Sequence, residues 1–268
     1  MKFINDCLQR FFHNGRGAFA LCMLAILPFV SFAQPSKTLQ LDGHTYQLQF
    51  KDEFNGKKLN TKKWLYRTDS KHWSTQLPAN VAVKDGILHL DLKKENAGDK
   101  QYTGAGIISA KPFHFGYYEA RMKIPPGAGW HTSFWLMGYN GKGGTGTENT
   151  TIEIDIIEND SKNPERYGIN LHRWQGEHKS MVKDITTPPM DEGFHTLACT
   201  YTPEYMKFYF DGKEVRMIDL KPLDFPLGPL NIWLTSIASH LGNTTEVDDS
   251  QLPSSAQFDY VRFYKLVQ

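Results

Sequence analysis

Apolar and polar residues alternate with a period of two along most of this chain, a pattern that predicts β-strands. No long stretch shows a helical period. Three Asp-Gly pairs, at 42–43, 85–86 and 211–212, lie between alternating runs and predict tight hairpins, because a type I′ turn needs positive φ at both central residues. We expect strands at 81–84 and 87–92, 104–110, 115–124, 130–138, 166–172, 194–202, 206–210 and 213–215, 229–237 and 257–266.

Many strands at regular spacing, separated by Gly and Pro turns, are typical of an all-β sandwich or barrel. The sequence contains no internal repeat and no linker. We therefore expect one all-β domain over residues 34–268.

The segment from Thr151 to Glu158 reads T-I-E-I-D-I-I-E and predicts a strand with an unusual acidic face. Regular alternation places Glu153 and Asp155 on one face and isoleucines on the other. The third acid comes one position late, at Glu158. A single-residue bulge would bring it back to the acidic face, because a bulge resets the alternation. We therefore expect three carboxylates in a row.

Such a row has a chemical use. Glu153 and Glu158 become i and i+4 of a bent strand, and their carboxyl groups can approach to roughly 5–6 Å, the separation of a retaining glycosidase. Asp155 between them favours keeping one proton in the set. The alternative is a charged edge strand that faces water. The absence of interleaved Lys or Arg and the aromatic neighbouring segments favour the active site.

Neighbouring segments offer groups that could bind a sugar. In 115–123, Glu119 and Arg121 share a strand face and either hydrogen-bond sugar hydroxyls or form a surface ion pair. In the next segment we expect one of Trp130 and Trp135 to face a cleft, because pyranose rings stack on indoles.

The segment 167–174, Y-G-I-N-L-H-R-W, places further polar groups after the acidic strand. Asn170, His172 and Trp174 share one strand face there, which makes them candidate substrate contacts, although a structural role is the usual one for such a histidine. No H-E-x-x-H motif, Cys/His cluster, Gly-rich nucleotide loop or G-x-S-x-G elbow occurs. The sequence thus gives no support to a metal, nucleotide or serine-hydrolase mechanism.

The N-terminal segment has the pattern of a signal peptide. Lys2, Arg10 and Arg16 precede an apolar run over 18–32, and Ser31-Phe32-Ala33 is a small-x-small cleavage site. We expect cleavage after Ala33, which leaves 268 − 33 = 235 residues with no membrane span, exported to a periplasm or the cell exterior. The formal net charge of +1 argues against nucleic acid as a partner.

Cysteine usage agrees with a fold held by its core. Cys7 and Cys22 lie in the signal segment, so Cys199 remains alone and no intrachain disulfide can form. A domain of this size buries roughly 70–75% of its unfolded surface and needs no disulfide. We expect a monomer.

E-I-D-I-I-E resembles the signature of glycoside hydrolase family 16 in its bulged E-x-D-x-x-E form. The resemblance extends over most of the chain after residue 33, at 52–64, 116–136, 194–215 and 258–264. It implies a concanavalin-like β-jelly roll, two antiparallel sheets with a sugar cleft on the concave one, and an endo-acting retaining hydrolase of β-linked polysaccharides. By position, Glu153 would be the nucleophile, Glu158 the acid/base, and Asp155 the residue that tunes their protons.

The resemblance also implies roles outside the acidic row. Glu119, Arg121, Asn170 and His172 fall where the family lines its cleft. Family members often hold a structural calcium on the convex side, for which Asp259 and the carbonyl of Gly86 are the matching candidates. Catalysis would need no cofactor.

Departures from the family pattern concern the substrate. Thr151-Ile152 stand where many β-glucanases have a Trp or a Cys-Gly pair, 232–243 lacks the usual glycine-rich wording, and Ser133 replaces a common Ala. β-1,3- or β-1,3-1,4-glucan is the default, and agar, porphyran and carrageenan are rivals. A sulfated galactan would suit a basic cleft, for which Arg121, Arg173 and His131 are candidates. A transglycosylase and a non-catalytic sugar-binding module are the remaining alternatives.

Overall fold

The computed structural model describes residues 35–139, 141 and 151–267. Internal contacts group 36–268 into one compact unit. The expected signal peptide, 1–33, lies outside the described residues. Within the described part, no helix is long and apolar enough to cross a membrane.

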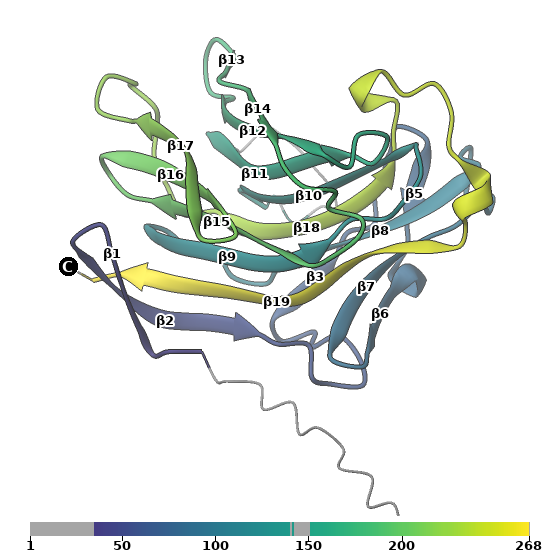
Figure 1. Ribbon diagram of the computed structural model, residues 1–268, viewed down its shortest axis with the longest axis horizontal. Helices are drawn as coiled ribbons and strands as arrows, with labels where there is room; N and C mark the ends of the chain where they lie inside the picture. Colours follow the sequence, from purple (N-terminus) through teal and green to yellow (C-terminus); the bar gives the residue numbers. More distant parts are fainter. Residues whose placement is uncertain (1–34, 140, 142–150, 268) are drawn as a thin grey trace, which may run out of the picture. The chain divides into compact units, whose positions relative to one another are not determined.

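Two curved β-sheets form the unit (Figure 1). The nine-stranded sheet has the order β1-β2-β19-β9-β15-β16-β17, and β7 and β6 extend it from β19. Its strands are β1 (Thr38–Leu41), β2 (His44–Asp52), β6 (Val81–Lys84), β7 (Ile87–Leu92), β9 (Gly116–Lys123), β15 (His195–Tyr201), β16 (Tyr205–Phe210), β17 (Lys213–Asp219) and β19 (Ser254–Leu266).

The ten-stranded sheet has the order β13-β12-β11-β10-β18-β8-β5-β4, with β14 on β12 and β3 on β8. Its strands are β3 (Trp64–Tyr66), β4 (Ser70–Lys71), β5 (Ser74–Gln76), β8 (Tyr102–Ser109), β10 (Trp130–Met137), β11 (Ile152–Asp160), β12 (Arg166–Arg173), β13 (Lys179–Ser180), β14 (Lys183–Thr186) and β18 (Asn231–Ala238). The pairing is antiparallel except between β5 and β8.

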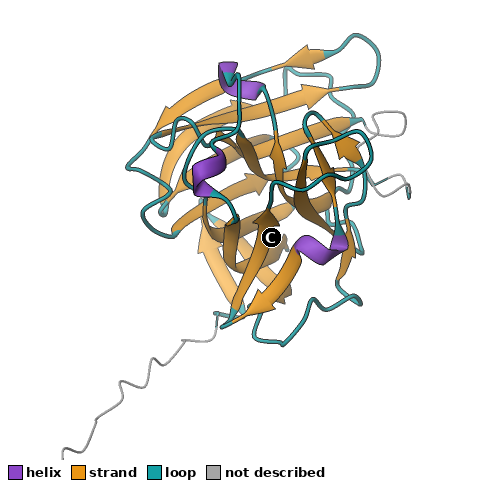
Figure 2. Ribbon diagram, turned by 90° about the vertical axis from the view of Figure 1, so that its right-hand side faces the viewer, coloured by secondary structure: helices purple, strands orange, loops and turns teal. Residues whose placement is uncertain are grey.

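Helical structure in the described residues is limited to short 3₁₀ turns (Figure 2). These are η1 (Pro78–Asn80), η2 (Leu241–Asn243) and η3 (Asp249–Gln251). The all-β prediction is confirmed, and so are two sheets of jelly-roll type.

The three Asp-Gly pairs form the hairpin turns expected of them. Each pair joins two neighbouring antiparallel strands, β1 to β2, β6 to β7 and β16 to β17. Both residues of each pair have positive φ, between 48° and 76°. The turn type follows from the dipeptide, since Asp tolerates and Gly favours this region.

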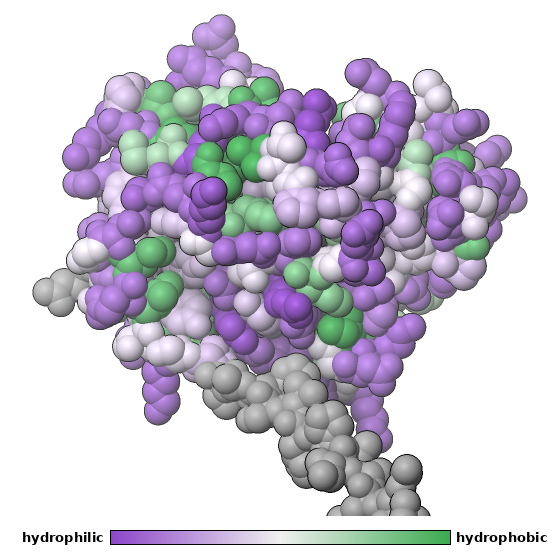
Figure 3. All heavy atoms as spheres, in the orientation of Figure 1, coloured by the Kyte–Doolittle hydropathy of each residue, from purple (hydrophilic) through white to green (hydrophobic). Residues whose placement is uncertain are grey.

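The main core lies between the two sheets. Alternate residues of β9 and β11, such as Tyr118, Met122, Ile152 and Ile154, are fully buried in one apolar cluster. Hydrophilic residues predominate on the face drawn in Figure 3, where apolar patches are small and scattered. Because side chains alternate along each strand, every second residue of the ten-stranded sheet points away from the core and is free to build a site.

Candidate active site

The acidic strand β11 contains the bulge that the sequence predicts. On β10, Phe134 pairs with Ile157 and the next residue, Trp135, pairs with Asp155, so Ile156 is the extra residue. Ile156 and Ile157 both belong to the buried core. The bulge therefore resets the alternation, and Glu158 lies on the same face as Glu153 and Asp155.

The three carboxylates line one cavity of about 90 Å³ on the outward face of the ten-stranded sheet, which we call the cleft. β10 supplies His131, Ser133 and Trp135 beside them. The rest of the wall comes from β18, from η2 and from the segment around the β4–β5 turn: Thr235, Ile237, Leu241, Arg67, Lys71 and His72.

Glu153 has a perturbed acidity. Burial raises its pKa to about 7, and the charge of Glu158 acts in the same direction. Trp174 opposes this shift, because its Nε1 donates a 2.7 Å hydrogen bond to Glu153 Oε2. The positive charge of Lys71 also lowers the pKa. Glu153 is thus a carboxylate that is ionised and desolvated at neutral to alkaline pH.

Asp155 is the proton holder of the row. The residue is 1% exposed, and burial together with the charges of Glu158 and Glu153 raises its pKa well above the ordinary value. A protonated Asp155 can donate its hydrogen bond to Glu153, which favours the ionised form of Glu153.

A polar chain from β12 braces Asp155. His172 Nε2 lies 3.4 Å from Asp155 Oδ2 and 2.9 Å from Asn170 Nδ2. Burial lowers the pKa of His172, so the ring is neutral at neutral pH. The other ring nitrogen, Nδ1, lies 2.9 Å from Nε2 of His178. Asn170 and His172 therefore lie beside the carboxylates and position the row, and their expected role as substrate contacts stays a prediction.

Glu158 faces a cationic partner. His131 Nε2 lies 3.3 Å from Glu158 Oε1, and its Nδ1 lies 2.8 Å from Asp160 Oδ1. Burial lowers the pKa of His131, but the hydrogen bonds to Asp160 and Glu158 outweigh it and raise the pKa to about 9. His131 thus provides a positive charge beside Glu158 at neutral pH.

Aromatic rings border the carboxylates on both sides. Trp174 stacks on His178, with ring centroids 4.2 Å apart and an interplanar angle of 12°. Trp135 lines the cleft and donates from Nε1 to Thr235 Oγ1 at 3.2 Å. Trp130 is buried in a separate apolar cluster, so Trp135 is the member of the predicted pair that faces the cleft.

The prediction that Glu119 and Arg121 line the cleft is wrong. Both lie on β9, a strand of the other sheet, and the alternate residues of β9 fill the core. Glu119 and Arg121 therefore point outward on the far sheet, where Glu119 lies 3.7 Å from Arg262 and Arg121 lies 2.6 Å from Asp259. Arg121 therefore forms a surface ion pair, as the alternative interpretation expected, but its partner is Asp259.

The expected calcium site does not fit the residues present. Asp259 Oδ2 accepts from the Arg121 guanidinium at 2.6 Å, so a cation already satisfies the only carboxylate of the candidate pair. Among the described residues, one group of three ligand-type side chains has its atoms within 4.8 Å of one another. That group is Glu153, Asp155 and His172, which belongs to the carboxylate row.

Sequence reasoning named His131 but missed two other basic residues of the cleft, Arg67 and Lys71. Arg67 is 2% exposed and makes two hydrogen bonds to Asp69, of 2.6 and 2.9 Å. Lys71 belongs to the two-residue strand β4 and Arg67 lies just before it, and a strand of this length is too short to show a period. No pattern in the sequence relates them to β11, which lies 80 or more residues later and reaches them only through the fold.

Comparison with known proteins gives a consistent picture. Residues 44–266 match the model of the GH16 domain of β-porphyranases A–D. β-Porphyranase B of Phocaeicola plebeius is 31% identical over 279 residues, 81% of this chain and 83% of that protein. A β-glucanase of Fibrobacter succinogenes is 27% identical over 176 residues, 63% of this chain and 49% of that enzyme. The structure of an endo-β-1,3-glucanase from Pyrococcus furiosus shares the fold, with a TM-score of 0.75 at 23% identity, over 87% of this chain and 100% of that one.

Proposed function

Since this chain belongs to glycoside hydrolase family 16, in the group of the β-porphyranase A–D domains, we propose that it is an endo-acting, retaining hydrolase of a porphyran-type sulfated galactan. The central support is the bulged row of Glu153, Asp155 and Glu158 in one cleft. A non-catalytic sugar-binding module would have no use for this row.

The first half of the reaction forms a covalent intermediate. The ionised Glu153 attacks the anomeric carbon, and Glu158 gives its proton to the glycosidic oxygen as the C–O bond breaks. Trp174 and Asp155 hold the attacking carboxylate by hydrogen bonds. His131 stabilises the Glu158 carboxylate that remains after proton transfer, because it is positively charged at 3.3 Å.

The second half returns the enzyme to its starting state. Glu158 takes a proton from water, the resulting hydroxide attacks the anomeric carbon, and Glu153 leaves as a carboxylate. Two inversions at one carbon give net retention. The product therefore keeps the β-configuration, and NMR of the first product formed checks this directly.

The charge of the cleft supports an anionic substrate. Lys71 and His131 are positive groups of the cleft wall, while Arg67 beside them is buried and already pairs with Asp69. A sulfate ester on a sugar unit next to the cleavage point could pair with such groups, since guanidinium and ammonium groups bind oxyanions well. Of the three candidates named from the sequence, His131 lines the cleft, whereas Arg121 and Arg173 do not.

β-Glucan is the second candidate. The β-glucanase of Fibrobacter succinogenes matches 63% of this chain, and the same carboxylate row would serve either polymer. The departures at Thr151-Ile152 and over 232–243 change residues other than the row, so they affect the choice of polymer more than the chemistry.

A reducing-sugar assay on a polysaccharide panel tests the proposal. The panel holds porphyran, chemically desulfated porphyran, agarose, carrageenan, laminarin, lichenan and xyloglucan, with the Glu153→Gln protein as the blank. We expect release from porphyran and a loss of at least about 10⁴-fold in the variant, because removing a covalent nucleophile costs that much or more. Release of reducing sugar from laminarin or lichenan alone would show that the substrate is a glucan and not a galactan. Products longer than the donor would indicate transglycosylation.

We also propose that the protein is exported with residues 1–33 as its signal peptide. The support is the basic, apolar and small-x-small pattern of this segment. Intact-mass measurement of protein from a culture medium or periplasm, with Gln34 as the first residue, is the expected result.

A further inference from the structure

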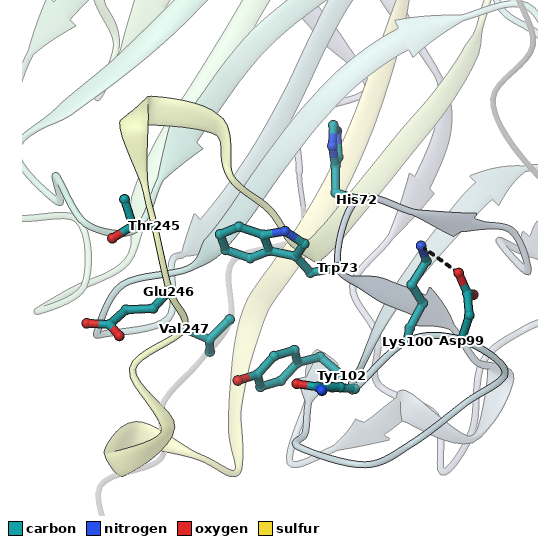
Figure 4. Close-up of a pocket in the computed structure, with 9 residues that line it drawn as sticks. His72, Trp73, Asp99, Lys100, Tyr102, Thr245, Glu246 and Val247 are labelled. Atoms are coloured by element: carbon teal, nitrogen blue, oxygen red, sulfur yellow. Dashed lines mark ion pairs between the residues drawn. The ribbon is translucent and has the colours of Figure 1, made fainter.

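A second cavity, of about 410 Å³, lies beside the cleft of the ten-stranded sheet. Its walls are the β4–β5 turn with His72 and Trp73, the approach to β8 with Asp99 to Tyr102, and the segment from Thr245 to Val247. Figure 4 shows the rings of Trp73, from the β4–β5 turn, and Tyr102, from β8, extending toward that segment. The volume falls within the range of ~300–1,000 Å³ in which small-molecule sites occur.

The cavity and the catalytic cleft meet at one residue. His72 lines both of them. In the sheet order, β5 is four strands from β11, which is roughly 19 Å at ~4.8 Å per strand. A polysaccharide seated on the carboxylates could therefore extend past His72 into the cavity, but only if it is several units long.

The lining has the composition of a sugar site. Trp73, Tyr102 and Val247 provide apolar surface, and Trp73 and Tyr102 are only partly buried. The rim is polar, with Gln101, Thr245, Glu246 and the ion pair of Lys100 and Asp99 at 3.1 Å. Aromatic faces below and hydrogen-bonding groups above suit a pyranose ring, which is apolar on its faces and polar at its edge.

The wall opposite Trp73 is fixed in place. Tyr102 donates a 3.0 Å hydrogen bond to Asp249, which also pairs with Lys94. Asp248 N donates to Ala128 O at 3.0 Å, and Gly129 packs so closely on Val247 that a Cβ there would lie 2.6 Å from the Val247 Cα. A preformed pocket binds with a smaller entropic cost than one that must order on binding.

The β4–β5 turn is a tight one and supplies two side chains that line the cavity. His72 has a φ of 53°, a region that favours Gly and Asn. Its ring packs edge-on against His240 with centroids 4.6 Å apart. Two-residue hairpin turns favour this conformation, as at Asp42 and Asp85, and here the turn places His72 and Trp73 in the cavity wall.

The cavity and the cleft differ in their charge. Lys100 is the one lysine or arginine among the residues that line the cavity, against the carboxylates of Asp99 and Glu246, so the formal sum is 1 − 2 = −1. Burial lowers the pKa of His72 to about 4, so His72 adds no positive charge at neutral pH. The exposed Glu246 therefore disfavours a sulfate ester here, whereas the cleft contains the positive charges of Lys71 and His131 beside its carboxylates.

From these observations we propose that this cavity is a distal subsite that selects an uncharged sugar unit of the same polysaccharide chain whose cleavage point lies at Glu153. The inference rests on the proposed function, because it takes the occupant to be a partly sulfated galactan. Such a polymer presents both charged and uncharged units, and the enzyme would then recognise a pattern of sulfation rather than a single unit.

The experiment measures kcat/KM over a series of porphyran oligosaccharides of increasing length and defined sulfation. Trp73→Ala should lower kcat/KM about tenfold, the value of one aromatic contact, and only for oligosaccharides long enough to reach the cavity. The variant should have a higher KM and an unchanged kcat, because Trp73 is remote from the reacting atoms. A melting curve confirms that the variant is folded.

Charge reversal on the rim tests the selectivity without touching the core. Glu246 is exposed, and Glu246→Lys should raise kcat/KM for long oligosaccharides with a sulfate at the distal unit relative to those without it. Glu192→Lys is the matched control, because Glu192 is exposed and lines neither the cavity nor the cleft. The control should keep the preference of the unmodified enzyme.

The outcomes separate the two proposals. An unmodified enzyme that is inactive on porphyran but active on a glucan would contradict the proposed function. If Trp73→Ala then changed kcat/KM equally for short and long oligosaccharides of that glucan, the subsite would be contradicted as well. Activity on porphyran with equal effects on short and long oligosaccharides, or with no effect on either, would overturn the subsite alone. An unaltered sulfation preference in Glu246→Lys would overturn its selectivity.

Discussion

Trp174 illustrates how one hydrogen bond sets the charge of a nucleophile. Glu153 is buried enough for its pKa to rise to about 7, and the indole of Trp174 is the largest influence in the opposite direction. A nucleophile must be ionised to attack. The acid side of the pH profile of kcat/KM should therefore report Glu153 and lie near pH 7.

We expect Trp174→Phe to move that acid limb to higher pH. Removing the donor destabilises the carboxylate, so the pKa of Glu153 rises further. Below about pH 7, kcat/KM should fall about 10- to 100-fold, since a hydrogen bond to a charged group is worth ~1.5–3 kcal/mol. The pH profile of kcat/KM measures both effects.

Trp135→Phe is the matched control for this variant. Trp135 also lines the cleft, but its Nε1 donates to Thr235 and not to a carboxylate. Its pH limb should stay in place even if its activity falls. An unshifted limb in Trp174→Phe would show that another group controls the acid side of the profile.

At the scale of the element, strand β11 carries one unpaired residue between its second and third carboxylates. Ile156 has no partner on β10, and the pairs on either side of it, Phe134 with Ile157 and Trp135 with Asp155, are already in register. Removing Ile156 would give a regular strand with the same pairs. The three acids would still share one face.

We therefore expect the deletion of Ile156 to leave measurable activity at a cost in stability. The cost is of the order of 2–5 kcal/mol, because a buried isoleucine is lost from the core. Deleting Ile154 also removes one buried isoleucine, but it moves Glu153 to the core face and should abolish activity. Reducing-sugar release and melting curves of both variants test this. Equal inactivity of two folded deletion variants would contradict the account of the bulge.

The strands that the sequence predicts are those whose period is long enough to read. The bulge was visible because a regular pattern is broken at a single position, and the hairpins because Asp-Gly has one favoured turn. The error at Glu119 and Arg121 has a physical cause. Alternation tells which residues share a face of a strand, but which sheet receives the strand depends on pairing between distant segments.

Two basic residues of the cleft, Arg67 and Lys71, and the second cavity were beyond sequence reasoning for a related reason. They come from β4, β5 and irregular segments of two or three residues, which carry no period. Arg67, Lys71 and Trp73 reach the site because β5 adds to the sheet in parallel, beside β8. Pairing of that kind leaves no local signature.

At the scale of the whole molecule, the active site lowers the stability of the fold. The pKa of Glu153 is raised from 4.5 to about 7, so its ionised form is disfavoured in the folded state. The sign follows from linkage. The penalty is absent well below the ordinary pKa, grows as pH rises above 4.5, and is complete above about 7.

Glu153→Gln should therefore be more stable than the unmodified protein in alkaline buffer and equally stable in acid. The expected rise in Tm is several degrees, since ~1 kcal/mol shifts Tm by about 2–4 °C at this size. Scanning calorimetry at pH values on both sides of the shift measures the difference. A Tm gain that is the same at every pH would point to packing instead of charge.

The ion pair of Arg121 and Asp259 predicts how the protein responds to chelators. Because a guanidinium satisfies Asp259, no calcium is needed to neutralise it. We expect EDTA to change Tm by less than about 1 °C, since a bound ion stabilises a fold only if it binds the folded state. Added calcium serves as the control. A fall in Tm that calcium reverses would contradict the ion-pair account.

Cys199 is a built-in probe of how often the fold opens. It is fully buried in β15, and it is the only thiol after residue 33. An alkylating reagent can reach it only when the two sheets separate, so the labelling rate of the chain from residue 34 should equal the population of open molecules multiplied by the intrinsic rate of the thiol. The free energy of opening can then be followed in native buffer, without denaturant and as sugar is added. Occupancy of the cleft or of the distal cavity would appear as a slower reaction at a residue that neither of them touches.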